Sequence, residues 1–246
     1  MDKTVPAGAA LLLDFIRKTE VGTEARNGYD IIYGHQQGRL PKPITQMNLA
    51  ELQGHQAKGW PAKSTASGGY QIMRKTLGDL RQELRLLDRQ IFDPDLQDRL
   101  AYHLLKRRGY EQFMVDKIGV PEFGKRLAQE WASFPVLAAT KGQHRQVARG
   151  ETFYAGDKLN KALVKPEAIE ALLAKVKAAG SGPVSAPPQP EIPKHPEPPA
   201  APIPVQPRPI PAHPSKEGRA MVPLPVSITI VFIVLAALGV AFFLGA

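Results

Sequence analysis

The sequence of 246 residues contains no cysteine. Disulfide bonds, thiolate metal sites and thiol nucleophiles are therefore excluded. The histidines are also too dispersed to form a metal-binding motif, and no glycine-rich phosphate loop follows a predicted strand. We expect neither a metal nor a cofactor.

A second missing feature is an array of stacking aromatic residues. The net charge of +9 favours polyanionic partners, such as anionic lipid headgroups or an acidic cell-wall polymer. Nucleic acid is also a polyanion, but the basic residues are scattered and no nucleic-acid-binding motif accompanies them. We do not expect nucleic acid to be a partner.

Charge is absent from the last part of the chain, and composition divides the sequence into three regions. Residues 1–180 mix apolar periodicity with charge and are expected to fold as one domain. Residues 181–225 are rich in proline and predict a linker, either an extended stalk of on the order of 140 Å or a disordered tether. Residues 226–246 are uncharged and would span roughly 32 Å as a helix, which predicts one transmembrane helix.

The flanks of this predicted helix suggest its orientation. Lys216 and Arg219 precede it and no charge follows it, so the positive-inside rule keeps the folded domain in the cytoplasm. No signal peptide is visible at the N-terminus. The sequence therefore predicts a single-pass tail anchor in the inner membrane, with membrane lipid as a partner.

Helix signals dominate residues 1–180. Asp93 and Pro94 begin a predicted helix that ends at Gly109, and Pro121 begins another. Further helices are expected over the ranges 70–87, 110–118 and 166–180. Strand signal is confined to Tyr29–Tyr33. The predicted fold class is α+β, mainly helical with a small sheet or hairpin.

Glu20 is the strongest candidate for a catalytic residue. It closes an apolar, helix-like stretch that contains Leu11, Leu12, Phe15 and Ile16. A carboxylic acid at a helix end, half covered by apolar neighbours, can keep its proton near neutral pH and pass it to a glycosidic oxygen. The alternative is a solvated surface carboxylate.

The segment Ser64–Gln71 has the composition of a cleft that holds sugar rings. Gly69 permits close approach of the backbone, Ser64, Ser67 and Gln71 offer hydrogen bonds, and Tyr70 offers a ring. An ordinary turn that leads into a helix is the alternative.

Four segments in this order resemble the lambda-type phage endolysins, which are lysozyme-like peptidoglycan lytic transglycosylases. Glu20 falls on the catalytic glutamate of that family, and residues 28–34 are similar to its Tyr-Asp-Val-Ile strand. Residues 64–71 resemble its Ser-Thr-Gly-Ala-Gly-Arg-Tyr-Gln cleft segment, and 131–135 its Trp-Ala-Ser-Leu-Pro motif. The resemblance covers about residues 8–178 and departs at Gly69, where the family has arginine, and over 50–62 and 136–160.

The resemblance implies an endolysin that cleaves the bond between N-acetylmuramic acid and N-acetylglucosamine for host cell lysis. Its expected partners are peptidoglycan glycan strands and a holin. Glu20 would be catalytic, and the substrate-binding residues would be Tyr29, Ser64, Ser67, Gly69, Tyr70 and Gln71. Trp131 is interpreted as a core residue rather than a sugar platform.

No second carboxylate is fixed opposite Glu20 by spacing, although Glu24, Asp30 and Glu51 are candidates. A one-acid transglycosylase is therefore the leading hypothesis. If Asp30 or Glu51 faced Glu20, a hydrolytic muramidase would be the better interpretation. A non-catalytic, membrane-anchored scaffold is a further alternative.

Overall fold

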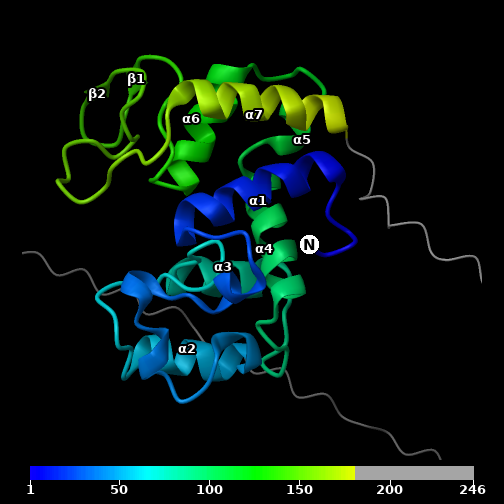
Figure 1. The fold of residues 1–246 in the computed structure, drawn as a ribbon, viewed down its shortest axis with the longest axis vertical. Helices are drawn as coiled ribbons and strands as arrows, with labels where there is room; N and C mark the ends of the chain where they lie inside the picture. The colour runs from blue at the N-terminus through cyan, green and yellow to red at the C-terminus, as the bar shows by residue number, and fades with distance from the viewer. Residues whose placement is uncertain (181–246) are drawn as a thin grey trace, which may run out of the picture. The chain divides into compact units, whose positions relative to one another are not determined.

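Helices dominate residues 1–180, the part of the chain that this computed structural model describes (Figure 1). These residues belong to one compact unit. Its α-helices are α1 (Ala7–Val21), α2 (Leu49–Ala57), α3 (Arg74–Glu83), α4 (Pro94–Arg107), α5 (Tyr110–Met114), α6 (Val120–Glu130) and α7 (Pro166–Ala179). Four 3₁₀ turns lie between α1 and α2, namely η1 (Arg26–Asp30), η2 (Tyr33–His35), η3 (Gln37–Arg39) and η4 (Ile44–Gln46).

The sheet of the described region is one antiparallel pair, β1 (Thr140–Lys141) and β2 (Gln146–Val147). The mainly helical fold with a small sheet, predicted from the sequence, is confirmed. Within residues 1–180, no helix is both long enough and apolar enough to cross a bilayer. The predicted linker and transmembrane helix lie outside the described residues.

Capping residues determine where several helices begin. The Asp93 carboxylate accepts a hydrogen bond from the Leu96 backbone N–H at 2.7 Å, and Pro94 occupies the first turn of α4. Pro121 and Pro166 lie in the first turns of α6 and α7 in the same way. These three predicted helix starts are confirmed.

Other predicted boundaries are wrong. The helix expected over 70–87 begins only at Arg74, because the chain forms a tight hairpin turn up to residue 72. The helix expected over 110–118 ends at Met114. Helix α2 was not predicted, although Asn48 and Glu51 form the capping box that begins it.

The strand expected at Tyr29–Tyr33 is also wrong. Its first half belongs to the 3₁₀ turn η1, and only Ile32 forms a bridge, with Ser67. Gly34 has a φ of +68°, so the chain turns away before a ladder can extend. The segment Tyr29–Tyr33 is therefore interrupted at both ends and does not extend as a strand.

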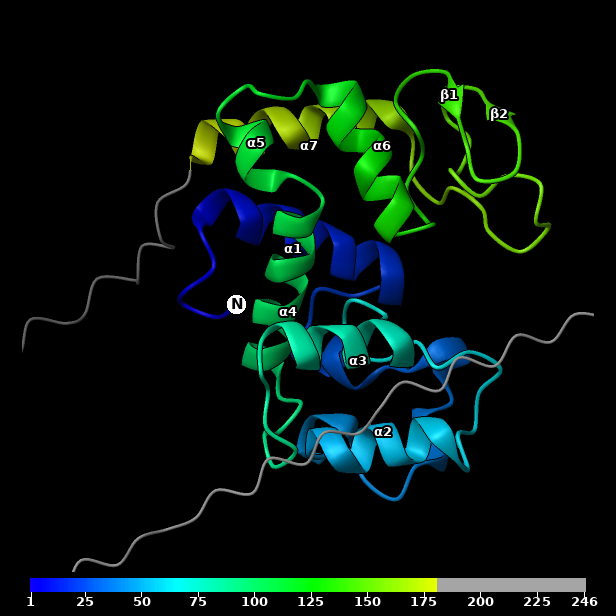
Figure 2. The same ribbon diagram turned by 180° about the vertical axis from the view of Figure 1, so that it is seen from behind.

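The helices form two groups within the unit. Figures 1 and 2 show α5, α6, α7 and the β1–β2 pair at one end, and α2 and α3 at the other. Helix α1 packs along α7 and also contacts α4, which runs between the two groups. Gly8 permits the close approach of α1 to α7, since a Cβ there would lie 2.6 Å from the Val176 carbonyl oxygen.

Candidate active site

Glu20 lies in the last turn of α1, as the sequence predicted. The helix ends because Gly22 adopts a φ of +76° and donates its backbone N–H to the Lys18 carbonyl at 2.9 Å. Leu13 and Ile16 on the preceding turns are fully buried. The core therefore holds the helix end that carries the Glu20 carboxyl group.

The Glu20 side chain is half-buried and has one direct polar partner, the hydroxyl of Ser133, which donates a hydrogen bond to Oε1. Burial raises the pKa of Glu20, and the Ser133 hydrogen bond partly opposes this by stabilising the carboxylate. The net effect is a raised pKa. This carboxyl group can therefore hold a proton at a higher pH than an exposed glutamate.

Ser133 follows α6 and is itself well fixed. Its carbonyl oxygen accepts a hydrogen bond from the Leu163 N–H at 2.7 Å. The neighbouring Phe134 ring packs edge-to-face on Phe15 of α1, with centroids 6.0 Å apart. Ser133 was not among the predicted site residues, although it lies in the Trp-Ala-Ser motif that carried part of the resemblance.

The cleft-like segment folds as a hairpin turn. Ser67 and Ile72 exchange both backbone hydrogen bonds, at 3.1 and 2.9 Å, and the four residues between them form the turn. Gly68 and Gln71 have positive φ values of 75° and 50°. A Cβ on Gly68 would meet the side chain of Gln97, so both the conformation and the space there require glycine.

Four of the predicted substrate-binding residues lie in the interior behind this turn. Tyr29 is 4% exposed, Tyr70 is 1% exposed and Ser67 is fully buried, while Gly69 is buried beneath Arg17. Hydrogen bonds within the protein engage both tyrosine hydroxyls and the Ser67 hydroxyl. We therefore correct the expectation for the three side chains: they are buried, they bond within the protein, and they support the hairpin from behind.

The two remaining predicted residues are half-buried. The Gln71 amide donates hydrogen bonds to the carbonyls of Gly68 at 2.8 Å and Ile31 at 3.2 Å, which joins the turn to the neighbouring chain. Ser64 accepts a hydrogen bond from the Trp60 indole through its carbonyl at 2.7 Å. Both can present a polar group at the surface, and their role in substrate binding stays a prediction.

An exposed tyrosine adjoins the hairpin and was missed in the sequence. Tyr33 is 50% exposed, and its N–H donates to the Ala66 carbonyl at 3.1 Å. An exposed ring with a hydroxyl can stack on a sugar and bond to it. The alternation of Ile32 and Tyr33 could have shown that the two side chains point to opposite sides.

A groove lies on the other side of the hairpin, between α2 and α3. Its volume is about 670 Å³, and it is lined by Thr65 and Met73 from the two ends of the hairpin, with Gln53, Arg74, Asp79 and Gln82. Glu20 and Ser133 are not among its lining residues.

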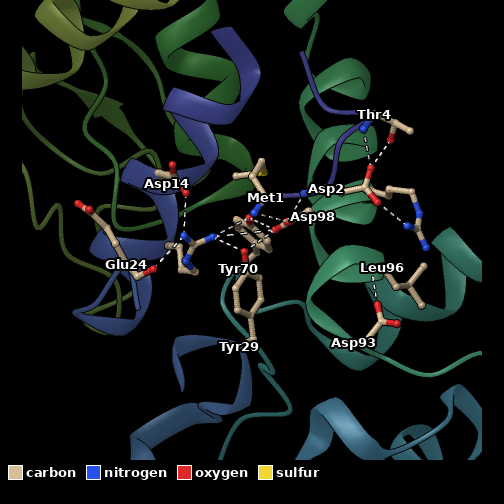
Figure 3. Close-up of polar contacts among 12 residues, drawn as sticks. Met1, Asp2, Thr4, Asp14, Glu24, Tyr29, Tyr70, Asp93, Leu96 and Asp98 are labelled. Atoms are coloured by element: carbon tan, nitrogen blue, oxygen red, sulfur yellow. Dashed lines mark hydrogen bonds and ion pairs between the residues drawn. The ribbon is translucent and has the colours of Figure 1, made fainter. Parts of the chain in front are cut away.

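Two adjacent residues of α4 hold the hairpin in place. Gln97 is fully buried; its Oε1 accepts from the Gly69 N–H at 3.0 Å, and its Nε2 donates to the Tyr29 carbonyl at 3.1 Å. Asp98 is fully buried and accepts hydrogen bonds from the hydroxyls of Tyr29 at 2.7 Å and Tyr70 at 2.6 Å (Figure 3). One residue thus fixes backbone groups and the next fixes side chains.

Trp131 connects this hairpin to the segment that holds Glu20. The ring is 4% exposed, and its indole N–H donates to the Tyr70 carbonyl at 3.3 Å. Ser133, which donates to Glu20, lies two residues further along the chain. The structure confirms Trp131 as a core residue.

Each candidate for a second carboxylate makes another contact. Glu24 pairs with Lys18 at 3.2 Å, and Asp30 accepts from the Thr45 N–H at 2.9 Å. Glu51 caps α2 and pairs with Lys42 at 3.0 Å. The backbone hydrogen bond at Asn48, together with Lys42, lowers the pKa of Glu51.

Residues 1–180 contain no group of three or more histidine, aspartate or glutamate side chains arranged to hold a metal ion. The family model described as Endolysin matches residues 10–155. The chain belongs to this family. It is a phage lysis enzyme that acts on peptidoglycan.

Two further comparisons accompany this family match. A solved structure of bacteriophage lambda lysozyme, complexed with a chitohexasaccharide, is similar to the endolysin with a TM-score of 0.41 and 22% sequence identity. The similarity covers 71% of the endolysin and 95% of the lambda lysozyme chain. The comparison with curated proteins finds no match.

Proposed function

We propose that this endolysin cleaves the bond between N-acetylmuramic acid and N-acetylglucosamine by lytic transglycosylation, with Glu20 as acid and then as base. The observation that carries the proposal is the half-buried Glu20 carboxyl, whose pKa is raised by burial and whose Oε1 accepts from the Ser133 hydroxyl. A general acid needs a pKa near the working pH, and burial supplies that change.

The reaction needs one carboxyl group in two roles. Glu20 donates its proton to the glycosidic oxygen as the bond from that oxygen to muramic C1 breaks. The C6 hydroxyl of the same muramic residue then bonds to C1, and its proton passes to the Glu20 carboxylate. The products are a 1,6-anhydromuramic end and a free hydroxyl on the departing sugar. Water is not consumed, and Glu20 regains its proton.

The contacts of the other carboxylates favour this mechanism over hydrolysis. A hydrolytic muramidase would need a second carboxylate to activate water or to stabilise the positive charge at C1. Glu24 and Glu51 are engaged in ion pairs with lysines, and Asp30 accepts a backbone N–H. A single carboxyl group, free of cationic partners, fits a reaction in which the substrate supplies its own nucleophile.

Digestion of purified peptidoglycan by the full-length protein, with products identified by mass spectrometry, tests the proposal. We expect anhydromuropeptides from the wild-type protein and none from Glu20→Gln. Glu24→Gln is the matched control, because it makes the same substitution at an exposed carboxylate four residues away. Reducing muropeptides would refute transglycosylation in favour of a muramidase, and no products at all would favour the scaffold hypothesis.

We also propose that residues 226–246 anchor the endolysin in the inner membrane of the host, with the catalytic domain first in the cytoplasm. The support is the absence of charge over this range and the basic residues Lys216 and Arg219 before it. Access to periplasmic peptidoglycan would then require a holin or an action of the anchor itself. Protease added to intact spheroplasts should leave the domain uncut, and digestion before lysis would contradict this topology.

A further inference from the structure

A buried arginine lies behind the active site. Arg17 is 5% exposed and precedes Glu20 by three residues on α1. Its Nη1 donates hydrogen bonds to the hydroxyls of Tyr29 at 2.5 Å and Tyr70 at 3.2 Å. Its Nη2 donates to the Glu24 carbonyl at 3.1 Å. Arg17 therefore contacts the chain on both sides of Glu20, as well as η1 and the hairpin turn.

Arg17 has two acidic partners. The partly exposed Asp14 accepts a hydrogen bond from Nη2 at 2.7 Å, and Asp98 is fully buried. An Asp98 carboxylate oxygen lies 3.9 Å from Nη1 and accepts hydrogen bonds from both tyrosine hydroxyls, so the two charges share two phenols (Figure 3). The other Asp98 oxygen accepts the Asp2 backbone N–H at 2.8 Å. Loss of Arg17 would leave the buried Asp98 carboxylate with the N-terminal amino group of Met1, at 3.7 Å, as its cationic partner, which should destabilise the protein.

The arginine side chain occupies space that a side chain at position 69 would need. A Cβ on Gly69 would lie 2.8 Å from Cδ and 3.1 Å from Cγ of Arg17. Gly69 is not among the glycines with positive φ, so its backbone conformation would accept a side chain. Arg17 alone therefore accounts for the closest contacts that require glycine at this position.

We propose that Arg17 is a positioning residue of this active site and that it replaces an arginine at position 69. The resembled cleft motif carries arginine where this chain has Gly69, and in this chain the side chain of Arg17, from α1, lies against position 69. By bonding to the Glu24 carbonyl and to Tyr70, Arg17 ties the helix end that carries Glu20 to the hairpin turn. The activity readout rests on the proposed function, whereas the stability readout does not.

A double-mutant cycle in the full-length protein tests the exchange. Arg17→Ala and Gly69→Arg should each lower the urea midpoint, because one empties the shared space and the other overfills it. The double variant Arg17→Ala/Gly69→Arg should regain at least half of either loss. A double variant as unstable as the sum of the two single effects would overturn the exchange.

Gly69→Ala makes the same test with a smaller disturbance. It should lower the urea midpoint of the wild-type protein, where the new Cβ meets Arg17, and leave the midpoint of Arg17→Ala unchanged. If Gly69→Ala costs the wild-type protein nothing, the two positions do not share space. This pair of variants keeps the test decisive if Gly69→Arg fails to fold.

The positioning role predicts a specific kinetic change. Arg17→Ala should lower kcat on peptidoglycan at least tenfold and change KM less than twofold, since it displaces the acid without removing a substrate contact. The double variant should restore kcat. Lys18→Ala is the matched control, as Lys18 is the next residue, 63% exposed and also near Glu24. An unchanged kcat in a destabilised Arg17→Ala protein would reduce Arg17 to a structural role. An inactive wild-type protein would refute the proposed function, while the urea cycle would still decide the exchange.

Discussion

Replacing Gln97 by methionine should loosen the hairpin without changing the volume of the core. The fully buried Gln97 amide makes three hydrogen bonds to backbone groups: with the Gly69 N–H at 3.0 Å, the Tyr29 carbonyl at 3.1 Å and the Phe92 carbonyl at 3.0 Å. Methionine has a similar shape but cannot make them. Each buried group left unpaired costs about 1 kcal/mol at the lower end of the usual range, so the total is about 3 kcal/mol.

This loss should be measured by thermal and urea unfolding of the full-length protein. For a domain of this size, about 3 kcal/mol corresponds to a Tm lowered by roughly 6 to 12 °C, which leaves the protein folded at room temperature. Gln112→Met is the matched control, because Gln112 is exposed and should change stability by less than about 0.5 kcal/mol. Equal effects of the two substitutions would refute the inference that Gln97 fixes the hairpin.

Four further predictions concern the site and the helix that carries it. Burial raises the pKa of Glu20 in the folded protein above its ordinary value of 4.5, so the free energy of unfolding should fall as the pH rises from 4.5 through the raised pKa. Glu20→Gln should therefore match the wild-type protein in urea unfolding below pH 4.5 and be more stable than it at neutral pH. Ser133→Ala removes a donor that stabilises the carboxylate, so the pKa of Glu20 should rise further and the alkaline limb of the kcat/KM profile should move to higher pH, whereas an unmoved limb would exclude this hydrogen bond from catalysis. Tyr33→Ala should raise KM several-fold with unchanged urea stability, because the ring is 50% exposed; an unchanged KM would remove Tyr33 from the substrate site. Gly8→Ala should destabilise the protein by about 1 to 3 kcal/mol through overpacking against α7. Gly54→Ala in α2 is the control: a Cβ there would have no atom within 4 Å, so this change should stabilise the protein by about 0.5 to 1 kcal/mol. Similar effects at both positions would contradict the close packing of α1 on α7.

Local sequence patterns predicted the parts of this fold that depend on neighbouring residues. The helix that carries Glu20 in its last turn and the cap at Asp93 depend on residues a few positions apart, and both predictions are confirmed. Contacts between distant residues leave no such pattern. Ser133 donates to Glu20 across 113 positions, and Asp98 accepts from Tyr29 across 69. Sequence reasoning therefore singled out Glu20 but not Ser133, which donates a hydrogen bond to it.

The misassigned tyrosines show a second limit. A tyrosine beside glycines has the same composition whether its ring faces a ligand or the core, because the ring is apolar and the hydroxyl needs one partner. At Tyr70 that partner is the buried carboxylate of Asp98, and burial raises the pKa of the tyrosine. The signal available in the sequence was Arg17, a charged residue on the apolar face of a helix, whose guanidinium needs several polar partners when it is buried.

The polar network behind the hairpin and the acid in front of it make opposite contributions to stability. Burial of Glu20 without a cationic partner costs stability once the carboxyl ionises, and the proposed role of Glu20 as an acid would carry that cost. Arg17 and Asp98 are also buried, but they are paired and share hydrogen bonds with two tyrosines, which fixes one arrangement of the chain. Because Arg17 lies one helical turn before Glu20, the fixed arrangement extends to the acid itself. Under the proposed positioning role, the placement of Glu20 thus depends on two charges that lie in the protein interior.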